Sequence, residues 1–272
     1  MSIWIAILFG IIQGFCEFLP VSSTAHLAML GNLFGVSSGS GNYDMFCAFL
    51  HFGSVLSVLI SFLNDMVGIV KDGRVIFSGS SQKRYPALRL VYLMLFASLP
   101  LIAVVPAAKY ISVLAQNTVF TGFMLIVNGF LLFMSERFIE SKKDEKNTMP
   151  LDAIIVGLCQ IVGAIPGISR VGVTYTGGRA MGFKRSFAVK FAVMLSALPL
   201  LGNNIIAAVN AAKSGFALSE LPACLIGMAV ALVTGVFAIR IFENSVKDNN
   251  LHGYSYYCYV AGFMFIILTM IF

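Results

Sequence analysis

Six long apolar stretches limit what this chain can fold into. Each has roughly 20 residues, the length of helix that crosses about 30 Å of hydrocarbon, whereas a membrane β-strand needs only about ten. In lipid the backbone N–H and C=O groups must be paired within the protein, which a helix achieves by itself. The sequence therefore predicts an all-α integral membrane protein with transmembrane helices at residues 45–63, 90–108, 118–135, 187–212, 222–242 and 254–272.

Composition supports this prediction and excludes a soluble enzyme. Hydrophobic residues make up 58% of the chain and charged residues 11%, whereas soluble domains have roughly 45–50% and about 25%. The net charge is +6, but the basic residues are dispersed and form no continuous face, so we expect no nucleic-acid partner. All five cysteines lie in apolar segments without a CxxC pair, and we expect them to serve packing.

Two further apolar regions, residues 3–35 and 151–182, are interrupted in the middle. The first break has the sequence EFLPVSST at residues 17–24, and the second has PGISR at residues 166–170. Neither half of either region is long enough for a comfortable span. Irregular backbone at membrane depth is tolerated only where protein or a water-filled cavity surrounds it. We therefore expect two re-entrant helix-loop-helix regions that line a site.

The distribution of lysine and arginine predicts the orientation. Residues 64–89 hold five of them, 136–150 four, 183–190 three and 240–253 two, whereas the alternate loops hold only Lys109 and Lys213. Positive residues collect in cytoplasmic loops. This count requires both broken regions to return to the side that they entered, the first from outside and the second from the cytoplasm. Both termini are then outside.

The two broken regions also share a pattern, which indicates an internal repeat. In each, Gly-x-x-Gln precedes a proline by six or seven residues, and a serine stands three residues after the proline: Gly10, Gln13, Pro20 and Ser23, then Gly157, Gln160, Pro166 and Ser169. Inverted repeats whose broken helices meet near the midplane are a recurring way to build a membrane binding site. We predict one polytopic domain, 1–272, with repeat halves 1–135 and 151–272 joined by the charged loop 136–150.

Polar residues at the two breaks predict the site. Glu17, His26 and Arg170 are ionisable groups inside apolar segments, which are costly there and functional by default. The residues that accompany them supply hydroxyl and amide groups: Gln13, Ser22, Ser23, Thr24, Ser169 and Thr174. An arginine fork and the N-termini of half-helices suit an anionic substrate.

Serine, imidazole and carboxylate together are an apparatus for phosphoryl chemistry. Ser23 and His26 are three residues apart and share a helical face if a helix begins near Ser22. Gln13 and Glu17 also share a face and could hold a hard divalent cation. The simpler alternatives are a Glu17–Arg170 ion pair, helix capping by Ser22 and Thr24, and a core role for His26. His51, on a spanning stretch, is a weaker candidate.

The segments EFLPVSSTAH at 17–26 and PGISRVGVT at 166–174 resemble the paired signature of the bacterial undecaprenyl-diphosphate phosphatase family, also called the bacitracin-resistance protein family. The likeness extends over nearly the whole chain. It implies a multi-pass enzyme of the bacterial cytoplasmic membrane that removes one phosphate from the C55 isoprenyl diphosphate and recycles the lipid carrier for peptidoglycan synthesis. It also implies a divalent cation, Mg²⁺ or Ca²⁺, an inverted-repeat fold, and a site open to the external side.

The resemblance also implies roles for individual residues. Glu17 is the motif carboxylate that assists metal or catalysis, His26 the catalytic imidazole and Ser23 the candidate nucleophile, with His26 or water as the other possible attacking groups. The residues expected to bind the diphosphate are Ser22, Thr24, Ser169, Arg170 and Thr174, with Arg170 also catalytic. The chain departs from the family at Gln13, where many members have glutamate, and at Val171, where serine is common.

Two other activities compete with the phosphatase interpretation. A polyprenyl-phosphate transporter would bind the head group with the same residues without cleaving it, but it has less use for Ser23, His26 and Glu17 together. The acid-phosphatase-like lipid phosphatases need a histidine after the Ser-Arg motif, and here none follows until His252. The expected partners are a polyprenyl diphosphate lipid and membrane lipids, and a homodimer is left open.

Overall fold

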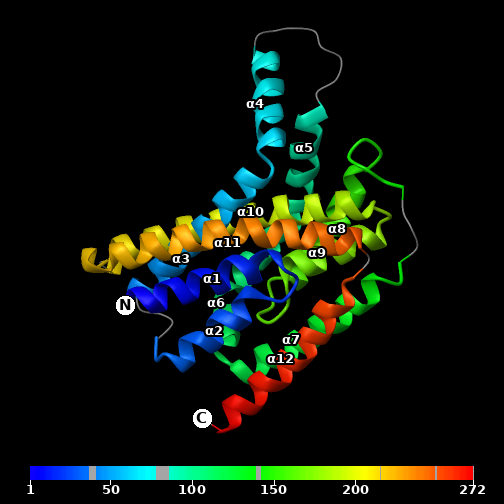
Figure 1. Ribbon diagram of the computed structural model, residues 1–272. Coiled ribbons are helices and arrows are strands. Elements are labelled where there is room, and N and C mark those ends of the chain that lie inside the picture. Colours follow the sequence, from blue (N-terminus) through cyan, green and yellow to red (C-terminus); the bar gives the residue numbers. More distant parts are fainter. Residues whose placement is uncertain (37–40, 78–85, 139–141, 215, 249, 272) are drawn as a thin grey trace.

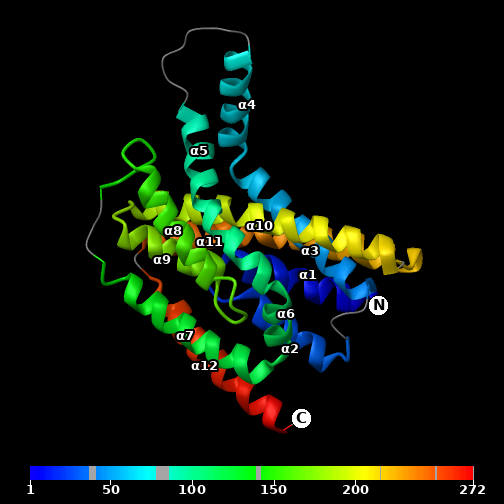
Figure 2. The same ribbon diagram turned by 180° about the vertical axis from the view of Figure 1, so that it is seen from behind.

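The computed structural model of the chain describes residues 1–36, 41–77, 86–138, 142–214, 216–248 and 250–271. Within these ranges the regular structure is helical, apart from an isolated β-bridge between Lys143 and Phe183. Figures 1 and 2 show the helices from opposite sides.

Six helical segments are long and apolar enough to cross a membrane, which confirms the predicted number of spans. They are α3 (Gly41–Ser61), the segment Ala87–Gln116, α7 (Thr118–Ser135), Arg185–Asn210 within α10 (Arg185–Ser214), the segment Leu218–Lys247, and α12 (His252–Ile271). The segment Leu218–Lys247 consists of a short 3₁₀ turn, η2 (Leu218–Glu220), followed by α11 (Leu221–Lys247).

The second span is not one continuous α-helix. It contains α5 (Pro86–Ser98), the 3₁₀ helix η1 (Leu99–Ala107) and α6 (Ala108–Gln116). Pro100 and Pro106 lie within η1, and each proline lacks the N–H needed for an α-helical hydrogen bond and crowds the preceding turn. Hydropathy alone did not predict this change of helix type.

The two interrupted regions are pairs of short helices, as predicted. The first is α1 (Ile3–Phe18) and α2 (Ser23–Leu33), and the second is α8 (Pro150–Val162) and α9 (Arg170–Ala180). The longest of them, α1, has 16 residues and so extends about 24 Å, which is less than the hydrocarbon thickness. The backbone has positive φ at Ser22 in the first break and at Gly167 in the second.

Close helix packing holds the breaks in place. Helices α1, α3 and α11 run side by side (Figures 1 and 2), and α8 packs against α5. Two glycines of the repeat pattern make these approaches possible. A Cβ at Gly10 would lie 2.7 Å from the Gly227 carbonyl oxygen, and one at Gly157 would lie 2.2 Å from that of Ala97. Helices α7 and α12 form an antiparallel pair.

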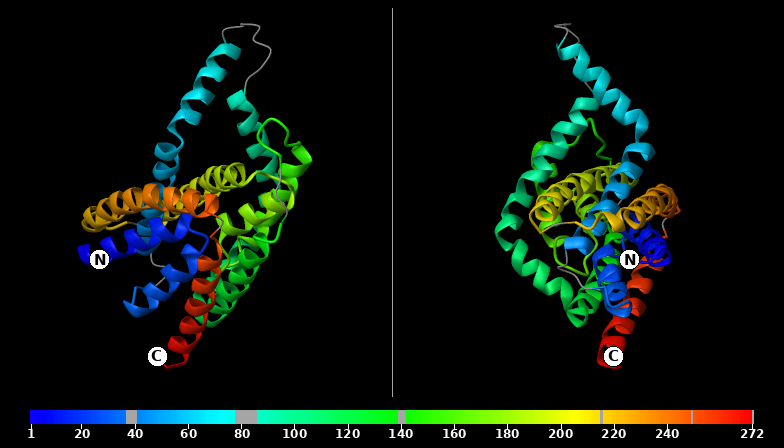
Figure 3. Two further views of the ribbon diagram at one scale, coloured as in Figure 1. Left: turned by 45° about the vertical axis from the view of Figure 1, so that its right-hand side comes forward. Right: turned by 90° about the vertical axis from the view of Figure 1, so that its left-hand side faces the viewer.

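Helices α4 (Leu63–Phe77) and α5 project from the body, and both termini lie on the side away from the tip of α4 (Figures 1 and 3). Loops that the charge count placed on one side do contact each other. Lys190 pairs with Asp65 and, at 3.6 Å, with Glu145, and Arg89 donates to the carbonyl of Thr148.

The opposite set of loops also comes together, since the N-terminal ammonium pairs with Glu220 at 2.6 Å. Some residues of the charge count lie outside the described part of the chain. They are Lys83, Arg84, part of the linker 136–150 and the side chain of Lys213.

Candidate functional site

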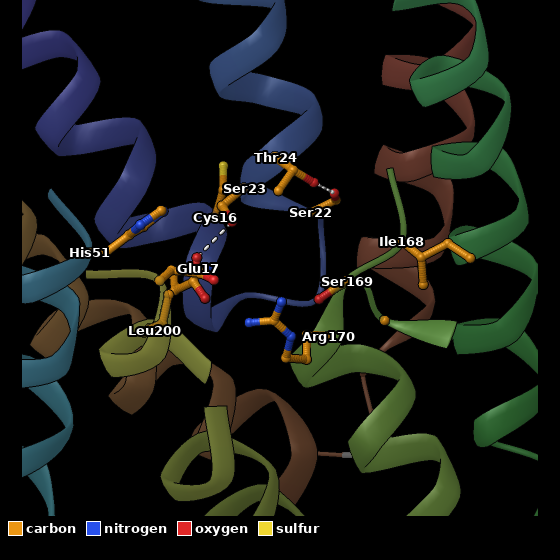
Figure 4. A pocket seen from close by; sticks show the side chains of 12 residues that line it. Cys16, Glu17, Ser22, Ser23, Thr24, His51, Ile168, Ser169, Arg170 and Leu200 are labelled. Carbon is orange, nitrogen blue, oxygen red and sulfur yellow. Dashed lines mark hydrogen bonds between the residues drawn. The ribbon is translucent and has the colours of Figure 1, made fainter. Parts of the chain in front are cut away.

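A small polar cavity lies where the two breaks meet (Figure 4). Its volume is about 60 Å³, room for only a few water molecules. It is bordered by the end of α1, the beginnings of α2 and α9, and residues of α3 and α10. Six of the predicted site residues line it: Glu17, Ser22, Ser23, Thr24, Ser169 and Arg170.

The carboxylate of Glu17 is held by hydrogen bonds within this cavity wall. Its Oε2 atom accepts a bond of 2.6 Å from the hydroxyl of Ser23 and one of 3.0 Å from the amide of Gln13. The Gln13 amide also donates to Ser54 of α3 at 3.2 Å. Hydrogen bonds to a carboxylate are roughly twice as strong as neutral ones. The carboxylate is therefore oriented toward the Ser23 hydroxyl before any substrate is present.

Arg170 begins α9 and is the basic group of the cavity. Its guanidinium makes no hydrogen bond or ion pair with any residue that the structure describes, and its Nε atom is buried without a partner. Figure 4 shows the guanidinium pointing toward the side where Glu17 lies. The alternative in which Glu17 only pairs with Arg170 is thus not what the geometry shows. An unpaired buried donor group is costly, so an anion from outside the chain is the expected partner.

Two helix N-termini converge on the same space. Ser169 caps α9, since its hydroxyl accepts from the N–H of Gly172 at 3.1 Å. Ser22 precedes α2 with φ of 67° and gives no side-chain cap, because its hydroxyl bonds to that of Thr24 at 3.1 Å. The first N–H groups of a helix lack internal partners and carry partial positive charge. Two helix N-termini at one cavity are the arrangement expected of a site for an anion.

Asn128 of α7 joins the two breaks. Its Nδ2 atom donates to the carbonyl of Pro20 at 2.8 Å, and its Oδ1 atom accepts from the N–H of Ser169 at 2.9 Å. A weaker contact, 3.4 Å from the N–H of Gly167 to the hydroxyl of Thr24, joins them directly. The sequence-based expectation that the breaks face each other is therefore met.

With this geometry established, comparison with known proteins gives the family. The profile described as "Bacitracin resistance protein BacA" matches residues 6–264. This chain belongs to the BacA family.

Curated members of the family match along their whole length. Among the relatives are proteins named undecaprenyl-diphosphatase from Halothermothrix orenii, 35% identical over all of both chains, and from Alkaliphilus metalliredigens, 32% identical over all of both chains. A third, from Methanobrevibacter smithii, is 33% identical and covers 96% of each chain. The sequence-based identification of the family is thus confirmed.

Three predicted site residues of this BacA-family chain do not line the cavity: Gln13, whose amide donates to Glu17, and His26 and Thr174. His26 packs against α12, where its Nδ1 atom bonds to the carbonyl of Ser22 at 2.8 Å and its Nε2 atom to the hydroxyl of Tyr257 at 2.7 Å. Its ring stacks on that of Tyr257 and meets Phe265 edge-on. Thr174 is buried, and its hydroxyl donates to the carbonyl of Arg170. Both side chains support the breaks in this conformation.

Two residues contribute to the cavity that sequence reasoning ranked low or missed. His51 of α3 and Asn203 of α10 line it opposite the breaks. Both helices reach this point as full spans. The sequence signal at each position was a polar residue in an apolar stretch, which indicates a functional role but does not show that the side chain faces the two breaks.

The side chains around the polar cavity offer few ligands for a divalent cation. Glu17 faces the cavity, but Gln13 does not line it and donates its amide to Glu17. Within the described ranges no three His, Cys, Asp or Glu side chains gather as a metal site. Mg²⁺ commonly takes one or two carboxylates and completes its shell with phosphate oxygens and water. Glu17 fits this arrangement. The Gln13 amide nitrogen donates to Glu17, and its Oε1 atom is buried without a partner among the described residues, so its role as a direct ligand stays a prediction.

Proposed function

We propose that the protein is a membrane phosphatase that hydrolyses undecaprenyl diphosphate to undecaprenyl phosphate and inorganic phosphate. The observation that carries the proposal is the hydrogen bond of 2.6 Å between Ser23 and Glu17, facing the same cavity as the unpaired guanidinium of Arg170. It supports a mechanism in which Glu17 accepts the proton of the Ser23 hydroxyl while Arg170 binds the phosphates. Relatives that match the whole chain are named for this activity.

The diphosphate head group occupies the polar cavity. Arg170 offers a planar fork to two phosphate oxygens, and the N-termini of α2 and α9 add N–H donors and positive potential. Ser169 sits at the second N-terminus, and Ser22 and Thr24 at the first. The cavity is too small for an isoprenyl chain, so the tail extends outward between helices into the bilayer.

The Ser23 hydroxyl acts as the nucleophile in this scheme. Its Oγ attacks the terminal phosphorus while its proton passes to Oε2 of Glu17. The Oγ–P bond forms as the anhydride P–O bond breaks, and undecaprenyl phosphate leaves. Water then attacks the phosphoserine: its oxygen bonds to phosphorus and its hydrogens leave with the product as dihydrogen phosphate, while the Oγ–P bond breaks and Ser23 Oγ takes back the proton held by Glu17. Arg170 and the helix N-termini stabilise the charge on the transferred group.

A divalent cation, Mg²⁺ or Ca²⁺, completes the proposed site. Glu17 would hold it together with diphosphate oxygens. When bound, it would neutralise charge on the phosphates. Gln13 keeps the Glu17 carboxylate oriented through its amide.

In this proposal His26 is a positioning residue that holds the conformation of the first break. Its bonds to Ser22 and Tyr257 hold the turn that begins α2, so that Ser23 faces Glu17. Direct attack or proton transfer by His26 stays a prediction, and it would require the ring to leave both partners. A transporter would need only the anion site and would gain nothing from the oriented hydroxyl–carboxylate pair.

The proposed architecture is an inverted repeat with two re-entrant regions, both termini outside and the cavity open to the external side. Two matching contacts between the halves support the repeat. The first helix of each half packs against a spanning helix of the other half, α1 against α11 and α8 against α5. Gly10 and Gly157, which hold the same place in the repeat pattern, make the close approach in each pair. Two wider cavities share His51 with the polar cavity and extend to Asn210, and one of them reaches Lys109 in α6, a residue that the charge count assigned to the external side.

The test is phosphate release from C55 isoprenyl diphosphate by the purified protein in detergent, with and without chelator. Ser23→Ala should abolish release, and Ser245→Ala, at the far end of α11, should not. Binding of the lipid without release by a folded wild-type protein would overturn the phosphatase proposal and favour the transporter.

A further inference from the structure

His51 occupies a position in the cavity that the mechanism above does not use. It comes from α3, whereas the other polar groups come from the breaks and from α10. It also lines both of the wider cavities that extend toward Asn210. The His51 side chain is therefore part of the wall that the polar cavity shares with the two wider cavities.

The ring of His51 has no hydrogen-bond partner among the described residues, in contrast to that of His26. Both nitrogens of His26 are occupied, by Ser22 and Tyr257. A neutral imidazole always carries one N–H donor and one acceptor. A polar ring held without a partner at a cavity wall is expected to bond to whatever fills the cavity. Figure 4 shows His51, Glu17 and Arg170 bordering this space from three different elements.

We propose that His51 contacts the substrate and donates a hydrogen bond from its imidazole N–H to the diphosphate, opposite Arg170. This inference rests on the proposed function for the identity of the head group. Arg170 and the helix N-termini approach the phosphates from the breaks, and His51 closes the side that faces α3. The neutral ring is sufficient for this role, since only its N–H is used.

The donor role makes a specific prediction for substitutions. Glutamine places an amide N–H at similar reach, so His51→Gln should keep kcat/KM within about fivefold of wild type. Leucine has similar bulk without a donor, so His51→Leu should lower kcat/KM about 10- to 100-fold, the range for one hydrogen bond to a charged group. His252→Leu, at the start of α12 and outside the cavity, is the matched control and should remain active.

Binding gives a readout that is separate from turnover. The probe is a polyprenyl methylenediphosphonate, a diphosphate analogue that cannot be hydrolysed. We expect His51→Leu to raise its Kd about 10-fold or more, and His51→Gln to leave Kd near that of wild type. In His51→Ala, added imidazole should restore part of the lost affinity, which a merely structural role would not allow.

Several results would overturn the proposal. His51→Leu with wild-type affinity for the analogue would show that the ring does not touch the head group. His51→Gln as weak as His51→Leu, in protein that elutes and melts like wild type, would exclude a donor role. A wild-type protein that binds the analogue but releases no phosphate from the lipid diphosphate would refute the phosphatase proposal, while the comparison of Kd values would still decide the role of His51.

Discussion

The Oδ1 atom of Asn128 accepts a hydrogen bond of 2.9 Å from the backbone N–H of Ser169. Through its other side-chain atom, Asn128 also holds the carbonyl of Pro20. One fully buried amide on α7 thus links the two breaks whose helix N-termini border the proposed anion site. The geometry of that site depends on a residue that does not line it.

Replacing Asn128 should therefore reduce activity without removing a catalytic group. Asn128→Leu loses both hydrogen bonds, and we expect kcat/KM to fall about 100-fold, the effect of misplacing reacting groups by about 1 Å. Asn128→Asp keeps an acceptor for the N–H of Ser169 but cannot donate to the carbonyl of Pro20. Its kcat/KM should therefore lie between those of the wild type and Asn128→Leu. The buried groups left unpaired cost roughly 1–3 kcal/mol each, so thermal unfolding is measured in parallel. Full activity in folded Asn128→Leu would contradict this role.

Arg170 should be the most sensitive single residue for turnover. Arg170→Ala removes the unpaired guanidinium, and we expect turnover to fall by roughly two to three orders of magnitude, the scale for one electrostatic donor. Arg170→Lys keeps the charge but loses the planar fork, so its loss should be smaller. Steady-state phosphate release measures both, with the exposed Arg240→Ala on α11 as control. Activity retained by Arg170→Ala would remove this residue from the site.

The spans and the breaks could be predicted because their causes are local. A run of apolar residues predicts burial in lipid, and Pro20 and Pro166 interrupt helices by the chemistry of their own backbone. The polar residues next to those prolines are adjacent in sequence, so Ser23, Glu17, Ser169 and Arg170 could be assigned to one site once the breaks were expected to meet.

What could not be predicted depends on long-range contacts. Asn128 is one polar residue in an apolar span, and only the fold shows that both breaks reach it. The period of α2 places Ser23 and His26 on one face, yet Tyr257, more than 200 residues away in sequence, binds the imidazole outside the cavity. The position of His51 likewise depends on how α3 packs against the breaks.

Glu17 has two proposed tasks, accepting the proton of Ser23 and holding the cation, and one substitution tests both. Glu17→Gln keeps the shape of the side chain but loses the charge, and we expect turnover to fall at least 100-fold. Because phosphate oxygens supply other ligands, extra Mg²⁺ should restore activity only in part. Phosphate release is measured across a Mg²⁺ titration, with Glu243→Gln as a control outside the cavity. Full activity at ordinary Mg²⁺ would refute both roles.

The contact between His26 and Tyr257 separates positioning from proton transfer. If the His26 ring only holds the turn at Ser22, Tyr257→Phe and His26→Ala should each lower kcat severalfold. Both changes remove the same His26–Tyr257 hydrogen bond, so kcat of the double variant should be little lower than that of His26→Ala. The pH dependence of kcat should keep its shape in all three. A profile that loses a limb in His26→Ala would instead establish the catalytic imidazole that the family resemblance implies.

The orientation can be tested at two exposed lysines, Lys109 at the start of α6 and Lys146 in the loop before α8. The positive-inside count places Lys109 outside and Lys146 in the cytoplasm. A membrane-impermeant maleimide should therefore label Lys109→Cys in intact spheroplasts, and label Lys146→Cys only after permeabilisation. The wild type is the background control, because its described cysteines are buried or half-buried. The reverse labelling pattern would invert the topology and place the opening of the cavity on the cytoplasmic side, since Lys109 lines the wider cavity that shares His51 with the polar one.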